Sequence, residues 1–248
     1  MIAVQVVDAT RASTPPAAAG VPVPAAIPII ALEHVSRVYA MGRMEVPALN
    51  DVTMEVLPGE FVAIVGPSGS GKTTMMNILG CLDRPTAGTY RLAGTPVADL
   101  DDDGLARLRS LTIGFVFQSY NLLPRTSALD NVATPLLYQG VSRKDRAARA
   151  KSTLERLGLG DRLTHEPTEL SGGQQQRVAV ARALVTEPAL ILADEPTGNL
   201  DSHSGAEVLG LLHELNAAGR TIVLITHDQE VADSATRQVH LRDGQIVS

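Results

Sequence analysis

The segment GPSGSGKT, at residues 66–73, places glycine, lysine and threonine in the spacing G-x-x-x-x-G-K-[ST]. It lies between EFVAIVG, an almost unbroken apolar run typical of a strand buried on both faces, and MMNILGCL, which has a helical pattern. Glycines allow main-chain N–H groups to surround phosphate oxygens, and a helix N-terminus adds the positive end of its dipole. The residues therefore predict a nucleoside triphosphate site.

Two side chains of this phosphate loop have specific expected roles. Lys72 is predicted to reach the β- and γ-phosphates, and the Thr73 hydroxyl is predicted to ligate Mg²⁺. We expect the nucleotide to contact the whole loop and the start of the helix, which comprise Gly66, Pro67, Ser68, Gly69, Ser70, Gly71, Lys72, Thr73 and Thr74.

An acidic pair, Asp194 and Glu195, ends the apolar run ALILA. Ligands of α/β proteins bind at the carboxyl ends of strands, where Asp194 fits the Walker B carboxylate that holds Mg²⁺. Glu195 could accept a proton from an attacking water, or it could only cap the following turn, and the local sequence leaves both open. A hydrolase needs such a second acid, whereas a phosphate-loop kinase does not.

Three further polar side chains end apolar runs. His227 closes TIVLITH and could hydrogen-bond the γ-phosphate or the attacking water, or it could be structural. Gln118 closes IGFVFQ, where a polar residue that merely ends a strand is the simpler interpretation. Tyr39 ends an early strand and could stack on a base, although packing at the core or the sheet edge is favoured by the sequence alone.

LSGGQQQR begins at Leu170 and forms the mouth of a second predicted helix. Ser171 is a good N-cap, and Gly172 and Gly173 permit close approach of the main chain to another group. A capped helix without a ligand is one interpretation. The other is a second anion site, which implies either a second ligand or a second copy of the chain that shares the first nucleotide.

Composition limits the possible functions. The 248 residues are 44% hydrophobic and 19% charged, which predicts a folded core. A net charge of −6 argues against a nucleic-acid partner. The single cysteine, Cys81, excludes an internal disulfide and fits a reducing cytosol. No stretch approaches the roughly 20 apolar residues of a membrane helix, and residues 1–28 are interpreted as a flexible Pro/Ala-rich leader.

The predicted elements alternate between strands and helices. Buried strands at 189–194 and 221–227 flank a helix at 202–218, so we expect an α/β fold with a parallel sheet. Residues 127–166 are mostly helical and predict an insertion, whose basic run at 143–151 is interpreted as a solvated face. RQVHLRDGQIVS predicts a closing hairpin over residues 243–244.

Taken in order, GPSGSGKT, Gln118, LSGGQ, ILADEP, GNLD and His227 resemble the motifs of an ABC-type ATPase, and the likeness runs from about residue 29 to the end. MNILGCLDRPTAGTY and LADEPTGNLDSHSG are most similar to the MacB/LolD/FtsE group, which includes exporters, lipoprotein-release pumps and a cell-division regulator. The resemblance implies an α/β P-loop NTPase fold at 29–248. Its mostly parallel central sheet carries an antiparallel β subdomain and a helical subdomain at about 120–170.

The resemblance also implies roles for single residues. Glu195 becomes the catalytic base, His227 the γ-phosphate switch and Tyr39 the adenine stack, while Gln118 contacts Mg²⁺ and relays its state to the helical subdomain. The family binds two ATP molecules between two head-to-tail subunits. The residues expected to bind the partner's ATP in trans are Ser171, Gly172, Gly173, Gln174 and Asp201.

The expected function is therefore an ATPase subunit that dimerises on ATP and powers a separately encoded membrane permease in export, lipoprotein release or efflux. Its implied cofactors are ATP and Mg²⁺, and its location is cytoplasmic, peripheral on the inner face of the plasma membrane. A periplasmic or extracellular accessory protein is a further implied partner. A regulator of the cell-division type is the alternative. Soluble ABC proteins of translation or DNA repair are disfavoured because this chain lacks their second cassette and long insertions.

Overall fold

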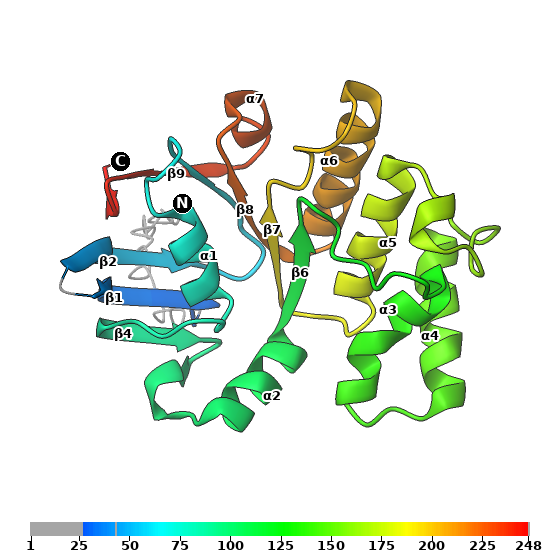
Figure 1. The fold of residues 1–248 in the computed structure, drawn as a ribbon, viewed down its shortest axis with the longest axis horizontal. Helices are drawn as coiled ribbons and strands as arrows, with labels where there is room; N and C mark the ends of the chain where they lie inside the picture. Colours follow the sequence, from blue (N-terminus) through cyan, green and yellow to red (C-terminus); the bar gives the residue numbers. More distant parts are fainter. Residues whose placement is uncertain (1–26, 43, 248) are drawn as a thin grey trace, which may run out of the picture.

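The computed structural model describes residues 27–42 and 44–247, so residues 1–26 of the predicted leader lie outside the described part. A six-stranded sheet with helices on both faces forms the centre of the molecule (Figure 1). All of its neighbouring strands pair in parallel except β9 and β10. In spatial order the strands are β10 (Gln245–Ile246), β9 (Arg237–Arg242), β3 (Phe61–Val65), β8 (Thr221–Thr226), β7 (Leu190–Asp194) and β6 (Ile113–Phe117).

The inner strands have no exposed face, as their apolar sequences predict. Every residue of β3 and β8 is buried, and β7 is buried up to Asp194. A strand of this kind must be covered by helices on both sides, which is the arrangement of parallel sheets. The predicted α/β class with a mostly parallel central sheet is confirmed.

A second, antiparallel sheet packs beside the first and contains the early strands. Its order is β2-β1-β4-β5, comprising β2 (Met44–Val56), β1 (Ile30–Met41), β4 (Ala87–Leu92) and β5 (Thr95–Pro96). The second half of β2 alternates between exposed and buried residues, so one face of this sheet packs against the core. The predicted hairpin at the end of the chain joins β9 and β10, and both Asp243 and Gly244 have the positive φ of a type I′ turn.

The helices divide between the two faces of the six-stranded sheet. Val62 and Ile64 of β3 pack in one cluster with α1, whereas Phe61, Ala63 and Val65 pack in the other with α5, α6 and α7. The helices of eight or more residues are α1 (Lys72–Leu79), α2 (Asp102–Thr112), α3 (Ala128–Tyr138), α4 (Arg143–Arg156), α5 (Gly172–Leu184) and α6 (Ser202–Ala217). A short helix α7 (Gln229–Ala232) follows β8, and 3-10 turns lie at Val97–Asp99 and Pro167–Glu169.

The predicted helical insertion corresponds to α3 and α4, which share a core with α5. Val132, Leu136 and Leu154 lie in this cluster, and Ser127 and Ser142 cap the two helices. Among the described residues, no helix is long and apolar enough to cross a membrane. Neither α2 nor β4 was predicted, because their short apolar patterns are weaker than those of the buried strands.

The contact between α5 and β6 depends on Gly114, and this dependence can be tested. A Cβ at Gly114 would lie 2.4 Å from the Ala183 carbonyl oxygen, which is main chain and cannot move aside. Gly114→Ala should lower the free energy of unfolding by about 1–3 kcal/mol. The control is Gly210→Ala, in the middle of α6, where a Cβ meets nothing and should add roughly 0.5–1 kcal/mol. Equal stability of both variants in denaturant unfolding would contradict this packing.

Candidate active site

The sheet brings the predicted polar residues to one edge. Register pairs join Val65 to Thr226 and Asp194 to Ile225, so β3, β8 and β7 end level with one another. The phosphate loop follows β3, Glu195 follows β7 and His227 follows β8, and all three therefore emerge at the same carboxyl edge. This is the edge at which open α/β sheets bind ligands.

The phosphate loop folds back over its own lysine. Lys72 Nζ donates to the carbonyl oxygens of Gly66 (2.6 Å) and Pro67 (2.8 Å). Gly69 and Gly71 both have positive φ, and Gly71 is the N-cap of α1. A Cβ at Gly71 would lie 2.5 Å from the Ala48 carbonyl oxygen, so this turn passes where only glycine fits. The result is an exposed curl of main chain at a helix N-terminus, the geometry of an anion site.

Asp194 lies at the end of β7 and is partly shielded from solvent. Burial raises its pKa, the adjacent Glu195 raises it further, and Lys72 opposes both effects. The Lys72 ammonium and the Asp194 carboxylate therefore act on each other across the edge of the sheet. A nearby cation favours the ionised form of a carboxylate whose pKa is raised in this way.

Glu195 is held in an unusual conformation by three groups from β8 and its end. Its φ is +45°, which is uncommon for any residue other than glycine. Its N–H donates to the Ile225 carbonyl (2.8 Å), and its carboxylate accepts from Thr226 Oγ1 (2.9 Å) and from the His227 N–H (3.0 Å). His227 Nδ1 also lies 2.6 Å from Glu195 Oε1. Glu195 and His227, which were predicted from the ends of two separate strands, are therefore in direct contact.

Gln118 reaches the turn that follows Glu195. Its Nε2 donates to Asn199 Oδ1 (3.2 Å), and Asn199 Nδ2 returns a bond to the Gln118 carbonyl (3.1 Å). Gly198 leaves room for this contact, because a Cβ there would lie 2.6 Å from Gln118 Nε2. Asn199 was not among the predicted residues, and only its position in GNLD could have indicated it.

Tyr39 occupies a different environment from the other predicted residues. Its hydroxyl donates to Asp83 (2.8 Å), the Arg37 guanidinium lies 4.5 Å from its ring centroid, and Arg37 is also paired with Asp83. These contacts agree with the interpretation that Tyr39 packs against neighbouring side chains. A role for Tyr39 in stacking on adenine stays a prediction.

The LSGGQ segment forms a complete capping box at the start of α5. Ser171 Oγ accepts from the Gln174 N–H (3.3 Å), and Gln174 Oε1 accepts from the Ser171 N–H (3.0 Å). Gly173 has a packing function as well, because a Cβ there would lie 2.9 Å from Ser204 Oγ in α6. The N–H groups of Gly172 and Gly173 stand in the first helical turn, where no acceptor within the helix exists.

Asp201 caps α6, the helix that packs beside α5. It accepts from the Ser204 N–H (3.0 Å) and the Ser204 hydroxyl (2.8 Å), and these bonds lower the pKa of its carboxyl group. Because Ser204 also touches Gly173, the starts of α5 and α6 lie side by side. The structure therefore groups Asp201 with the LSGGQ segment rather than with the phosphate loop.

The two helix N-termini of one chain lie apart. The helix α1 covers one face of the sheet, whereas α5 covers the other face and packs on β6. Two strands separate β3 from β6, a distance of about 14 Å at ordinary strand spacing. Figure 1 shows α1 with the antiparallel sheet at one end of the molecule and α3, α4 and α5 at the other. A triphosphate on α1 is thus remote from α5 of its own chain.

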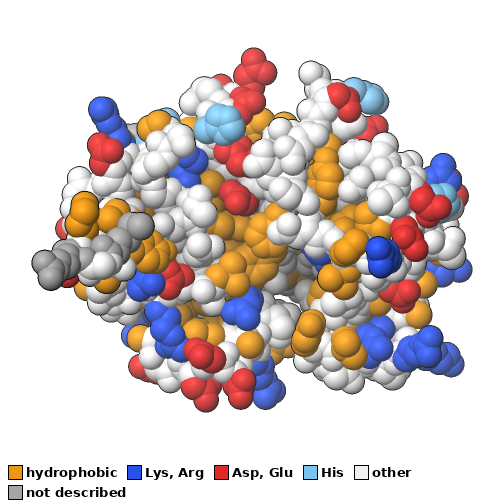
Figure 2. Space-filling model, in the orientation of Figure 1, with side chains coloured by type: hydrophobic (Ala, Val, Ile, Leu, Met, Phe, Trp, Pro, Cys, Tyr) orange, Lys and Arg blue, Asp and Glu red, His pale blue; other side chains and the backbone are white. Residues whose placement is uncertain are grey.

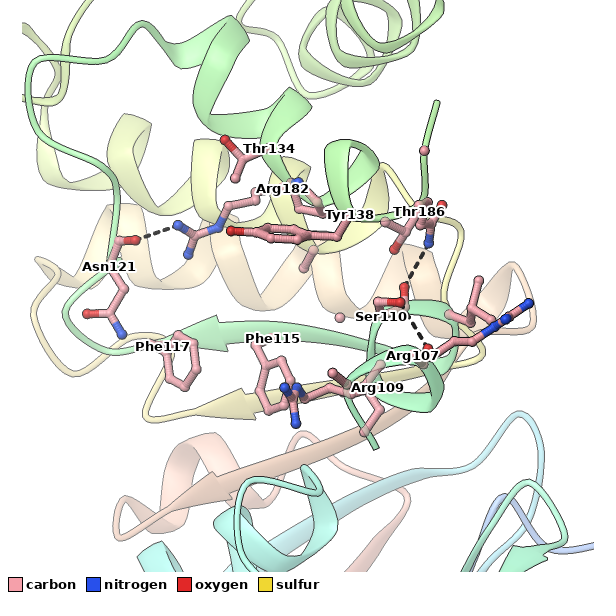
Figure 3. Close-up of a pocket in the computed structure, with 18 of the residues that line it drawn as sticks. Arg107, Arg109, Ser110, Phe115, Phe117, Asn121, Thr134, Tyr138, Arg182 and Thr186 are labelled. Atoms are coloured by element: carbon pink, nitrogen blue, oxygen red, sulfur yellow. Dashed lines mark hydrogen bonds between the residues drawn. The ribbon is translucent and has the colours of Figure 1, made fainter. Parts of the chain in front are cut away.

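A groove lies between α2, β6, the end of α3 and the last turn of α5, and no residue pattern predicted it. Its volume is about 1100 Å³, and its lining includes Leu111, Phe115, Phe117, Tyr138 and Arg182. Figure 3 shows Tyr138 extending across it, and in Figure 2 hydrophobic side chains gather around the hollow between the lobes that carry α2 and α3. Tyr138 is 79% exposed and Leu111 53% exposed, which is unusual for large apolar side chains.

Arg182 joins the floor of this groove to the segment after Gln118. Its guanidinium donates to the carbonyl oxygens of Tyr120 (2.8 Å) and Asn121, and burial lowers its pKa. At the other end of α5, a Cβ at Gly172 would lie 3.0 Å from the Tyr120 hydroxyl. The segment that follows Gln118 is therefore bonded to the last turn of α5 and lies close to the first turn of that helix.

Comparison with known sequences agrees with this geometry. The profile of the ABC transporter family matches residues 49–198. The macrolide export ATP-binding/permease protein MacB of Hyphomonas neptunium is 57% identical over 221 residues, which are 89% of this chain but 34% of that protein. The chain thus spans about a third of the length of such relatives. An uncharacterized ABC transporter ATP-binding protein, YvrO of Bacillus subtilis, is 52% identical, with 88% of this chain and 96% of that protein covered.

A solved structure has the same fold. It is a dimeric post-hydrolysis state of the ATP-binding cassette MJ0796 bound to ADP and Pi, with a TM-score of 0.81 and 46% identity. The match covers 88% of this chain and 97% of that one. With the phosphate loop, the acidic pair and the LSGGQ helix arranged as above, the chain belongs to the ABC transporter family and is an ATP-binding cassette of that family.

Proposed function

We propose that this chain is the ATP-hydrolysing nucleotide-binding subunit of a transporter with a permease of the MacB or LolD type. Two copies would close head to tail on two ATP molecules. The observation that carries this proposal is the separation of α1 from α5: the two helix N-termini that could bind phosphate lie on opposite faces of the sheet, with two strands between β3 and β6. A second copy would supply the missing half of each site.

ATP bound at the phosphate loop would lie along the exposed curl that starts at Gly66, with its phosphates at the start of α1. The Lys72 ammonium, now on loop carbonyls, is within one side chain's reach of the phosphates. The oxygen donors near them fit Mg²⁺, which prefers one or two carboxylates, neutral oxygens and substrate phosphates. We assign this role to Asp194, Thr73 and Gln118. The ion would neutralise charge on the phosphates and would stabilise the ionised form of Asp194.

Glu195 is the group best placed to accept a proton from the attacking water. Its carboxylate is fixed by Thr226 and by the main chain of His227, so it needs little reorganisation on reaction. The His227 ring contacts Glu195 through Nδ1, and 68% of its side chain is exposed, so the second ring nitrogen would be available to bind the γ-phosphate. Hydrolysis would remove the γ-phosphate, and the His227 ring would then lose this contact.

The trans half of the site would come from Ser171, Gly172, Gly173 and Gln174, with Asp201 beside them. The Ser171 oxygen accepts a bond from Gln174, so its hydroxyl hydrogen remains free to donate to a phosphate oxygen. To shift the ratio of closed to open dimers from 1:99 to 99:1, ATP must bind the closed dimer more tightly than the open one by about 5.5 kcal/mol. Charge-assisted contacts to two γ-phosphates are of a suitable size to supply it.

The groove is the proposed docking surface for the permease, which would place the chain at the inner face of a membrane. It joins the helical subdomain to the segment after Gln118, and Arg182 and Tyr120 link that segment to α5. A permease segment seated there could therefore act on both the nucleotide site and the LSGGQ helix. Export, efflux or lipoprotein release would follow from the permease, as would any accessory protein outside the membrane.

Sharing of the site can be tested with mixed dimers. Lys72→Ala removes the phosphate contact in cis and Ser171→Arg blocks the contact in trans, so neither variant alone forms a complete site. A mixed dimer retains one intact site, and a 1:1 mixture should hydrolyse ATP well above the sum of the separate variants. Activity equal to that sum, with mixed dimers shown to form, would mean that sites are not shared.

The two carboxylates of opposite pKa shift predict opposite stability effects. The pKa of Asp194 is raised, so its charge costs stability at neutral pH, and the cost disappears as the pH falls through that pKa. Asp194→Asn should raise the melting temperature of the nucleotide-free protein but lose the further gain that the parent shows with Mg²⁺ and ATP. Thermal unfolding with and without nucleotide measures both effects.

Asp201→Asn is the matched control at the edge of α6. In the parent the pKa of Asp201 is lowered, so its carboxylate stabilises the fold at pH values above the unfolded-state pKa of about 3.9. This stabilisation disappears as the pH falls through the folded-state pKa. The melting temperature should drop at pH 7 and approach that of the parent in acid. A lower melting temperature for nucleotide-free Asp194→Asn would contradict the stated cause of its pKa shift.

Docking at the groove predicts a separation of basal and coupled activity. Tyr138→Asp places a charge in the apolar groove and should leave basal ATPase within about twofold, because Tyr138 is an exposed residue at the end of α3, while stimulation by the permease should fall about tenfold or more. Leu57→Asp, an exposed apolar residue outside the groove, is the control. If the permease stimulates Tyr138→Asp as strongly as it stimulates the parent, the groove is not the docking surface.

A further inference from the structure

Gln176, in the second turn of α5, is a fully buried amide with a single hydrogen bond. Its side chain is 0% exposed, and its Nε2 donates to the carbonyl oxygen of Pro196 at 2.7 Å. Among the described residues, its Oε1 finds no hydrogen-bond partner. An unsatisfied buried oxygen lowers stability, whereas an apolar side chain of the same shape would remove that oxygen but leave the Pro196 carbonyl without its donor. The bond to Pro196, rather than packing, therefore explains glutamine at this position.

The bond to Pro196 holds the turn that begins with Glu195. Residues 195–198, here called the catalytic turn, are closed by a bond from the Gly198 N–H to the Glu195 carbonyl (3.0 Å). Pro196 occupies the second position of this turn, where its fixed φ is favoured. The oxygen that Gln176 binds belongs to the central peptide of the turn, so Gln176 fixes the plane of that peptide.

The catalytic turn needs external support because Glu195 has a φ of +45°. A left-handed residue of this kind persists only where its surroundings hold it. The β8 strand supplies one side of that support through the Ile225 carbonyl, and Gln118 supplies another through Asn199. Gln176 supplies the third from α5, which covers the sheet face opposite α1.

We propose that Gln176 is a positioning residue for hydrolysis: by holding the Pro196 carbonyl it keeps the Glu195 carboxylate directed at the attacking water. This inference rests on the proposed role of Glu195 as the base. It also gives α5 two tasks, because the helix that presents Ser171 to the ATP of one site holds the catalytic turn of the other site. Movement of α5 on dimer closure is then transmitted to Glu195 through one hydrogen bond.

The decisive variant is Gln176→Met, which keeps the length of the side chain and removes the donor. Its kcat for ATP should fall by about 10- to 100-fold, the usual effect of a misplaced catalytic group, with KM for ATP and ATP-driven dimerisation unchanged. Its melting temperature should change little, because the variant removes one unsatisfied oxygen, that of the amide, and leaves another, the Pro196 carbonyl oxygen, without its donor. A merely structural glutamine would leave kcat intact whatever the melting temperature, and that outcome would overturn the proposal.

Asn216→Leu is the matched control. Asn216 Nδ2 donates to the Gly59 carbonyl (2.8 Å) and so ties two elements by the same kind of bond, at the opposite edge of the sheet. Its kcat should not change. An equal fall in kcat for Asn216→Leu and Gln176→Met would show that loss of any such tie is sufficient, which overturns the proposal.

A double-mutant cycle with Glu195→Gln separates this inference from the role of Glu195 itself. Glu195→Gln should bind ATP, dimerise stably and barely hydrolyse, and adding Gln176→Met should then lower the residual rate by less than twofold. Normal hydrolysis by Glu195→Gln would remove the base assignment. An inactive Glu195→Gln beside a fully active Gln176→Met, or additive losses in the double variant, would overturn the role of Gln176 alone.

Discussion

The parallel pairing of β3, β8 and β7 is the constraint on which the site depends. Because Val65 pairs with Thr226 and Asp194 with Ile225, three chain segments that are distant in sequence leave the sheet at one level. That register brings the His227 N–H to Glu195 and sets the Lys72 ammonium and the Asp194 carboxylate in each other's field. The middle residues of these strands are apolar and buried, so apolar burial tolerates a slip by one residue, but the slip would misplace every polar group at this edge.

The same sheet also separates the two helix N-termini at which phosphate could bind. Its two faces carry different helices, and the N-termini of α1 and α5 are kept apart by the strands between them. A rigid, close-packed interior cannot bring them together, and the proposed head-to-tail dimer would pair each with its counterpart on the other copy. The left-handed conformation of Glu195 and the hydrogen bonds that hold it fix its carboxylate in the chain without nucleotide, as electrostatic preorganisation of the proposed base requires.

Local chemistry made much of this molecule predictable. The phosphate loop, the acidic pair and the capped LSGGQ helix are short motifs whose residues need only their own neighbours, and the apolar runs located β3, β7 and β8. Contacts between distant segments were not predictable: Gln118 with Asn199, Gly173 with Ser204, and the groove around Tyr138. Each of these depends on how α5, α6 and the helical insertion pack, and no periodicity encodes that.

The glycine pair in LSGGQQQR shows which properties follow from the local sequence and which follow from the tertiary structure. By itself the sequence determined that a helix begins there with a serine cap and that its mouth can bind an anion, because capping and helix dipoles are properties of a few consecutive residues. Only the tertiary structure decided that Gly173 is required by α6 and that Gln176 reaches the catalytic turn. It alone also placed this mouth away from the phosphate loop of its own chain. These are distances between elements, and they are set by sheet order and helix packing.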